Sequence, residues 1–387
     1  AENNNNNKMD SMFISFAQSV AEETFQIATN PGQDESADRD AFVQQCKKAV
    51  PSDVRMFSGC KDNQTSADVS NIASFGLPPA SGPSGAGGAC TNSMMLALEN
   101  NPDVSWVQLL DDMRKILKQK GYSQIPELSA SRDLDLNEKF TLNNPVGGGK
   151  KKALLIGINY IGQKGELSGC INDVARMKKY VEGQGFDDIQ ILTDETSAKP
   201  TYKNIMNGLL WLADGAAAGD SLFMHYSGHG GRLADQDGDE KDGYDETMVP
   251  VDYQKSGQMR DDDIFKALIA PLPADVHLTV VMDCCHSGSI LDLPFMLIGD
   301  DASMEAFEGG AAMSMLANPG FNIQFVLKIA KQLYQLYQGS GAGTKSIDTS
   351  LFASAITGGY GGNKGDDEEE EEEDVASKFG GFAKSFW

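Results

Sequence analysis

Two patterns of apolar and polar residues divide this chain, and the change from one to the other falls near residue 150. From residue 152 onward, short apolar runs alternate with stretches in which apolar residues recur every three or four positions. The runs predict strands and the helical spacing predicts helices. The expected strands are 153–158, 189–192, 221–225 and 276–282, and the expected helices are 171–182, 202–212 and 263–269. This alternation predicts an α/β fold, with a mostly parallel central sheet and helices on both faces.

The flanking segments have a less regular pattern. The chain begins with an asparagine run at 3–7 that we expect to be disordered, and it ends in a Gly-rich and then acidic stretch. Glycine, proline and serine dominate residues 76–88, which predicts a loop. The other elements expected outside the alternating part are helices over 9–20, 91–99, 106–118 and 323–337 and a strand over 54–58.

The charge of the chain argues against two classes of partner. Asp and Glu outnumber Lys and Arg by 56 to 32, a net charge of -24 that remains strongly negative without the nine acids of Asp366–Asp374. A chain this acidic repels phosphate backbones and anionic lipid, so we expect neither nucleic-acid nor membrane binding.

Six cysteines in 387 residues do not suggest a disulfide framework, and scattered cysteines are typical of a reducing compartment. No apolar run approaches the ~18 residues of a membrane span, and no secretory signal is visible at the start. We therefore expect a cytoplasmic protein.

Two of the expected strands run into chemically reactive residues. One continues as His225-Tyr-Ser-Gly-His229-Gly-Gly, and the other as Asp283-Cys284-Cys285-His286-Ser-Gly-Ser. Ligands of open parallel sheets bind beyond the carboxyl ends of the strands, where both runs fall. A thiol near an imidazole is the pair used for nucleophilic acyl transfer. A single buried Cys or His is more often structural, but glycines flank His229 and follow Cys285, which favours exposed turns and catalysis.

Metal chemistry can be tested against the same residues. His225 and His229 are four apart, but Gly228 interrupts any helix that would align them, so zinc is disfavoured. The acidic segment 235–246 resembles a calcium-binding loop, but Glu240 stands where an EF-hand requires glycine. Composition alone slightly favours a solvated acidic hairpin there.

The two reactive runs, together with Lys152–Tyr160 and Ser168–Val174, resemble the large-subunit region of metacaspases, which are caspase-like cysteine proteases. His229 precedes Cys285 by 56 residues, close to the spacing known for caspases. Phe57–Asp68 and Pro126–Ser131 resemble the metacaspase small-subunit region. That region normally follows the catalytic cysteine but precedes it here, an order that resembles type III metacaspases of algae.

The resemblance implies a caspase-like fold in which strands of both regions share one sheet. It divides the chain into six parts: an N-terminal helical extension (1–50), the small-subunit-like region (51–142), a Gly/Lys linker (143–151), the large-subunit-like catalytic region (152–300), a C-terminal helical extension (301–362) and an acidic flexible tail (363–387). Most caspases pair through a small-subunit strand, but metacaspases often do not, so we expect a monomer.

The resemblance also implies roles for individual residues. His229 is the expected general base and Cys285 the nucleophile, and the backbone N–H groups of Gly230 and Cys285 are expected to form the oxyanion hole. The pocket for the residue before the scissile bond maps to Asp173, Ser227 and Asp283. Its two carboxylates imply protein or peptide substrates cleaved after Arg or Lys.

A calcium site is implied as well, and its expected ligands are Asp245, Asp261, Asp262 and Asp292, with Asp263 as an alternative at the adjacent pair. The function implied by the resemblance is thus a calcium-activated cysteine endopeptidase. Two other classes stay open, a catalytically silent calcium-binding scaffold and a redox-active thiol protein using Cys284 and Cys285.

Overall fold

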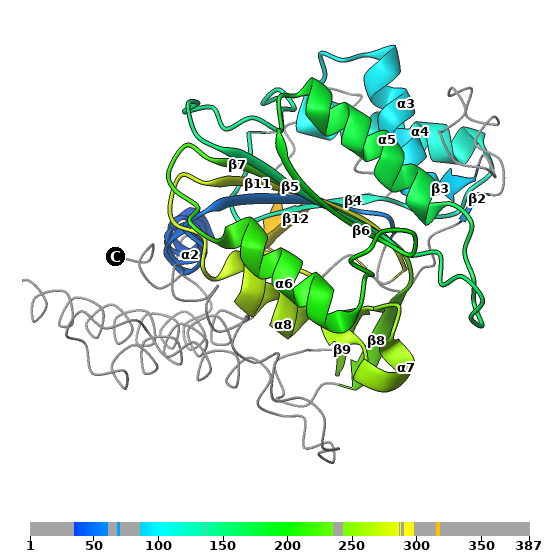
Figure 1. Cartoon of the computed structure of the whole chain (residues 1–387). Coiled ribbons are helices and arrows are strands. Elements are labelled where there is room, and N and C mark those ends of the chain that lie inside the picture. Colours follow the sequence, from blue (N-terminus) through cyan, green and yellow to red (C-terminus); the bar gives the residue numbers. More distant parts are fainter. Residues whose placement is uncertain are drawn as a thin grey trace, which may run out of the picture.

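A computed structural model gives the fold, and it describes residues 35–60, 68–69, 86–135, 137–234, 243–285, 287, 290–297 and 315–317. Its centre is an eight-stranded sheet in the order β13-β12-β4-β1-β11-β7-β5-β6 (Figure 1). The strands are β1 (Asp53–Ser58), β4 (Glu127–Ala130), β5 (Lys151–Gly157), β6 (Asp188–Thr193), β7 (Ser221–Ser227), β11 (His277–Asp283), β12 (Phe295–Leu297) and β13 (Leu316–Ala317). The five strands from β1 to β6 in this order are parallel, and β4, β12 and β13 each pair antiparallel with their neighbours.

Helices cover both faces of this sheet, as the alternating pattern predicts (Figure 1). One face carries α3 (Ala89–Asn100), α4 (Trp106–Gln119) and α5 (Cys170–Gly183). The other carries α6 (Tyr202–Ala213), α8 (Asp261–Ile264) and the π-helix Phe265–Ile269. The expected α/β fold with a mostly parallel central sheet is confirmed, and strands of both the small-subunit-like and large-subunit-like regions lie in one sheet. None of the helices in the described part is long and apolar enough to cross a bilayer.

Successive side chains of a strand point to opposite faces, and this sorts the core. On β5, Leu154 and Ile156 lie in the core under α6, whereas Ala153 and Leu155 lie under α3 to α5. The same alternation on β7 puts Phe223 on the α3–α5 face. Residues of β7 that are an even number of positions from Phe223, such as Ser227, therefore point to that same face.

Several elements differ from the sequence-based expectation. The helix expected over 263–269 begins two residues earlier as α8 and continues as a π-helix, which closes with the Ala270 N–H bonded to the Phe265 carbonyl. Phe265, Leu268 and Ile269 are all buried against the core. The last residues of the expected loop 76–88 form β3 (Gly87–Gly88), which pairs with β2 (Asp68–Val69).

The acidic insertion contains regular structure that the sequence did not predict. Its flanks form a three-stranded antiparallel sheet of β8 (Gly230–Ala234), β9 (Tyr244–Met248) and β10 (Met259–Arg260), with the short helix α7 (Tyr253–Ser256) between β9 and β10. These strands are short, so their hydrophobic pattern carries little signal.

Both extensions contribute to the described core. Helix α2 (Glu35–Ala49) was not expected, yet its Cys46 and the following Val50 are buried. In the C-terminal extension, where we expected helix, residues 316–317 form β13 on the edge of the main sheet, because β12 offers an open edge there. The helices expected over 9–20 and 323–337, the asparagine run and the acidic tail lie outside the described residues.

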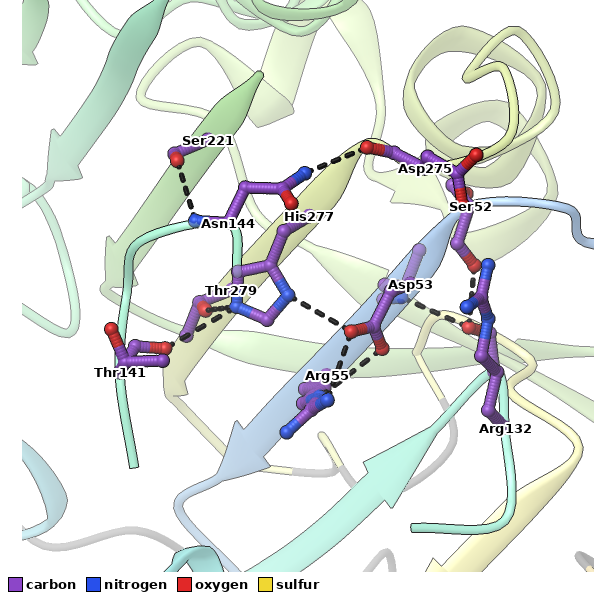
Figure 2. Close-up of polar contacts among 12 residues, drawn as sticks. Ser52, Asp53, Arg55, Arg132, Thr141, Asn144, Ser221, Asp275, His277 and Thr279 are labelled. Atoms are coloured by element: carbon purple, nitrogen blue, oxygen red, sulfur yellow. Dashed lines mark hydrogen bonds and ion pairs between the residues drawn. The ribbon is translucent and has the colours of Figure 1, made fainter. Parts of the chain in front are cut away.

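A buried polar network fastens the small-subunit-like region to the large one at the amino ends of β1 and β11 (Figure 2). Asp53 accepts hydrogen bonds from Arg55 and His277, at 2.9 and 3.0 Å, and Asp53 lies opposite His277 in the parallel register. Arg55 also bonds Glu138 and stacks over the Trp106 ring. Burial alone would raise the pKa of Asp53, but the hydrogen bonds and charges of His277 and Arg55 outweigh it and hold that pKa well below its usual range.

We expect Asp53→Asn to lower the free energy of unfolding by about 3 kcal/mol at pH 7, because it leaves Arg55 buried without its full counter-charge. A carboxyl with a depressed folded pKa contributes stability above its unfolded pKa of ~3.9 and loses it as pH falls below that value. Urea unfolding at pH 6.5 and 3.5 should therefore show a larger acid-induced loss in the parent than in Asp53→Asn. Asp103→Asn, which removes an exposed ion pair with Lys139, is the control. Equal acid sensitivity of parent and Asp53→Asn would contradict this assignment.

Candidate active site

The carboxyl ends of β7 and β11 bring the two reactive runs together. The strands pair in parallel along their whole length, and Asp283 lies opposite Ser227 at their ends. His229 follows β7 directly, and Cys284 and Cys285 follow β11. A methyl group placed on Gly230 would lie 1.9 Å from the carbonyl oxygen of Cys285. The loop of His229 and the loop of Cys285 are therefore in direct contact, and only glycine fits at position 230.

His229 is held on three sides. Its backbone N–H donates to the Tyr160 hydroxyl at 2.9 Å, and the two rings lie 4.7 Å apart. Its carbonyl oxygen accepts from the Tyr226 hydroxyl at 2.7 Å. Its ring Nε2 lies 2.6 Å from the carbonyl oxygen of Gly165. A carbonyl oxygen can only accept, so Nε2 carries the proton and the neutral ring has its lone pair on Nδ1.

The two adjacent cysteines have different surroundings. Cys284 is buried, and burial together with the neighbouring Cys60 raises its pKa well above the usual value. Its carbonyl oxygen accepts a hydrogen bond from Ser287. Cys285 is partly exposed. The thiolate is the reactive form, so the buried Cys284 is unsuited to attack a substrate.

The three residues expected in the substrate pocket do meet. Asp173, from the first turn of α5, accepts a hydrogen bond from the Ser227 hydroxyl at 2.9 Å. Asp283 lies close enough to raise the pKa of Asp173 further, after burial, which is the larger cause. All three side chains are on the α3–α5 face of the sheet and are almost fully buried, with Asp173 1% and Asp283 5% exposed.

Helix α3 of the small-subunit-like region holds both carboxylates, which the sequence did not predict. The Gly88 N–H donates to Asp173 Oδ2 and the Thr91 N–H donates to Asp283 Oδ2, both at 2.7 Å. These N–H groups belong to the start of α3, which has no capping side chain of its own. The positive end of the helix therefore offsets part of the cost of burying two acids. A β-carbon at Gly88 would lie 2.2 Å from Asp283 Oδ2, so glycine is required between the two acids.

Another buried polar residue, His225, supports the same helix. Its Nε2 lies 3.1 Å from the Thr91 hydroxyl, and burial lowers the pKa of His225 to about 3. His225 is therefore neutral at physiological pH and structural in this arrangement, not the metal ligand that its spacing to His229 could suggest. Thr91, Asn92 and Gly88 gave no signal in the sequence, because nothing local links them to Asp173 or Asp283.

The four carboxylates expected to bind calcium are not gathered. Within the described residues there is no group of three or more His, Cys, Asp or Glu side chains that could hold a metal ion. Asp245 is paired with Arg260, and Asp262 with Lys266 at 2.9 Å. Asp261 accepts the N–H of Glu246. The alternative ligand Asp263 instead accepts a hydrogen bond from Tyr202.

Comparison with known proteins identifies the class of this site. The model of the metacaspase peptidase C14 domain matches residues 151–294, and that of the caspase domain matches residues 5–136. Metacaspase III c of Phaeodactylum tricornutum is 46% identical over 68% of this chain and 80% of its own length. Metacaspase-1 of Coccidioides immitis is 52% identical over 38% of this chain and 33% of its own length, and Metacaspase-1 of Mycosarcoma maydis 50% over 38% of each.

Fold, site and matches thus define a cysteine-type peptidase of the caspase kind. The chain belongs to the metacaspase family, with its small-subunit-like region placed first. The long match to the diatom protein crosses both regions, whereas the fungal metacaspases match over about a third of their length.

Gly230→Ala should abolish most peptidase activity, because its methyl group would push the Cys285 backbone away from His229. Hydrolysis of a fluorescently labelled casein measures the effect, and we expect a loss of about a hundredfold or more, as for other displaced catalytic groups. Gly183→Ala is the matched control, since nothing lies within 4 Å of the added methyl group there. Unchanged activity of Gly230→Ala would contradict the close contact of the two loops.

Proposed function

We propose that this metacaspase is a cysteine endopeptidase that cleaves peptide bonds after Arg or Lys, with Cys285 as nucleophile and His229 as general base. The observation that carries the proposal is the convergence of Asp173 and Asp283 on Gly88, beside the strand end that leads to Cys285. A pocket of two buried carboxylates suits a guanidinium or ammonium group and repels an Asp side chain.

The imidazole geometry supports the role of His229. Because Nε2 donates to the Gly165 carbonyl, Nδ1 is free to take the thiol proton of Cys285 and later to protonate the leaving amine. The Gly165 carbonyl stabilises the resulting imidazolium. The N–H groups of Gly230 and Cys285 are the proposed oxyanion donors, and they belong to two segments that lie in direct contact.

The electrostatics of the pocket support a cationic substrate side chain. Burial and the adjacent Asp283 raise the pKa of Asp173, so without a cation the pair tends to retain a proton. An entering guanidinium replaces that proton and satisfies both acids. An uncharged side chain would leave the pair without a counter-charge, which is the physical basis of the proposed specificity.

Peptides of one sequence ending in Arg, Lys or Asp before a fluorogenic group test this proposal. The parent should cleave the Arg and Lys peptides and leave the Asp peptide intact. Cys285→Ala should abolish cleavage, whereas Cys284→Ala, which alters the neighbouring buried thiol, should keep much of it. Cleavage after Asp, or an active Cys285→Ala with an inactive Cys284→Ala, would sink the proposal. If the protein is a catalytically silent scaffold, no variant should cleave any peptide. If it is a redox-active thiol protein, Cys284→Ala and Cys285→Ala should impair its activity equally.

Calcium activation is the second part of the proposal. Asp245, Asp261, Asp262 and Asp292 supply the carboxylate oxygens that calcium prefers, and Asp245, Asp261 and Asp292 are buried acids in a strongly negative chain. They belong to β9, to α8 and to the segment after Cys285. The donor chemistry fits the ion, but Arg260 and Lys266 have to release Asp245 and Asp262 for these oxygens to be available. A calcium ion held by these four aspartates would supply the positive charge that offsets their mutual repulsion.

In the inactive Cys285→Ala background, calcium should raise the melting temperature after chelation, and Asp262→Ala should shift the titration to higher calcium by about tenfold or more, since one charged ligand is lost. Magnesium should substitute poorly. Asp263→Asn tests the neighbouring position, and we expect it to titrate like the parent because Asp263 is engaged with Tyr202. Identical curves for the parent and Asp262→Ala would exclude this ligand set.

We further propose a cytoplasmic monomer that binds neither nucleic acid nor membranes. The small-subunit strand β4, through which a caspase-like pair could form, is covered on its outer side by β12, and β12 by β13. Light scattering on the purified chain would overturn this if it gave the mass of a dimer.

A further inference from the structure

Asn92 is a buried amide in the first turns of α3, between Asp173 and the helix backbone. Its side chain is fully buried. Its Nδ2 donates to the Gly88 carbonyl at 2.7 Å and to Asp173 Oδ1 at 3.1 Å. Its Oδ1 has no hydrogen-bond partner among the described residues.

The orientation of this amide follows from its partners. Both atoms that contact Nδ2 are acceptors, so the group that faces them has to be the NH₂ donor. Turning the amide over would set three oxygens against one another. The side-chain oxygen of Asn92 is thus the atom without a hydrogen-bond partner. It lies in the same amide plane as the nitrogen that contacts Asp173.

A buried acceptor without a partner is costly, and native structures contain few of them. Asn is also a poor residue for a helix interior, since it favours caps and turns. Ala or Leu would serve α3 better at this position. The position therefore points to a partner that arrives with the substrate.

Asp173 has room for that partner as well. It accepts three hydrogen bonds, from Gly88, Ser227 and Asn92, out of about four that a carboxylate can take. One planar group with several N–H donors could bond both Asp173 and the Asn92 oxygen.

We propose that Asn92 is a specificity-determining residue whose Oδ1 accepts an N–H of a substrate guanidinium, so that the pocket favours Arg over Lys. The inference rests on the proposed cleavage after basic residues. Guanidinium has five N–H donors in a wide planar fork, whereas ammonium has three on one atom, which two carboxylates already occupy. The extra acceptor therefore adds more to Arg binding than to Lys binding.

The test is the ratio of kcat/KM for two peptides that differ only in Arg or Lys before the scissile bond. Asn92→Ala should lower the value for the Arg peptide about tenfold more than that for the Lys peptide, the effect of losing one hydrogen bond to a charged group. Asn92→Leu, which has a similar volume and no oxygen, should lose the Arg preference in the same way. Ser93→Ala is the matched control, because Ser93 is a buried neighbour bonded to the Cys90 carbonyl.

The outcomes separate the two proposals. If the parent cleaves neither peptide, the proposed function fails. If the parent cleaves both and Asn92→Ala lowers both by the same factor, Asn92 only supports Asp173 and this inference is overturned. A full Arg preference in Asn92→Leu would also overturn it, since the Asn92 oxygen would then not be responsible. Thermal unfolding checks that each variant is folded; if Asn92→Ala is not, the Asn92→Leu ratio alone decides.

Discussion

The parallel pairing of β1 with β11 is the interaction on which the rest of this structure depends. Six residue pairs, from Asp53 with His277 to Ser58 with Met282, join the small-subunit-like region to the strand that leads to Cys285. The pairing continues at the carboxyl end, where the Gly59 N–H donates to the Met282 carbonyl. At the amino end of the two strands, the buried hydrogen bond between Asp53 and His277 joins them through their side chains. Two regions that are reversed in chain order relative to most of their family thereby form one sheet.

This pairing has a direct consequence for the active site. Because β1 and β11 pair in parallel and end together, the carboxyl end of β11 is open to the small-subunit-like region, and the start of α3 lies beside Asp283. The helix then supplies N–H groups to Asp173 and Asp283, two acids from the other region. Both regions hold this acid pair, since the acids and the Ser227 donor belong to one region and the Gly88, Thr91 and Asn92 donors to the other. Chain order is immaterial to such a site, because only the sheet positions matter.

The main elements were predictable where the hydrophobic pattern was strong. The long buried strands β5, β7 and β11 and the amphipathic α4 follow from their sequences within one or two residues. Strands β12 and β13 are short and form because the main sheet offers an open edge, and β8 to β10 are short strands that pair with one another in a separate sheet, so their own hydrophobic pattern predicted neither group. The candidate residues Asp173, Ser227 and Asp283 were found through the family resemblance, and the structure brings them together.

What the sequence could not reveal is long-range. Thr91 and Asp283 are 192 residues apart, and no local signal relates them. Asn92 looks like an unfavourable helix residue until its contact with Asp173 is known. In the same way, four aspartates suggested a calcium site, but only the structure reveals that Arg260 and Lys266 occupy two of them.

The central claim is that the acid pair delivers a basic residue to Cys285. Covalent labelling tests it most directly: the protein, with calcium, is treated with a peptidyl chloromethyl ketone ending in Arg and, separately, with one ending in Asp. Peptide mapping by mass spectrometry then locates the label. The account predicts rapid alkylation of Cys285 alone by the Arg reagent, slowed strongly in Asp283→Ala, and no reaction with the Asp reagent. Labelling of Cys284, or equal labelling by both reagents, would contradict it.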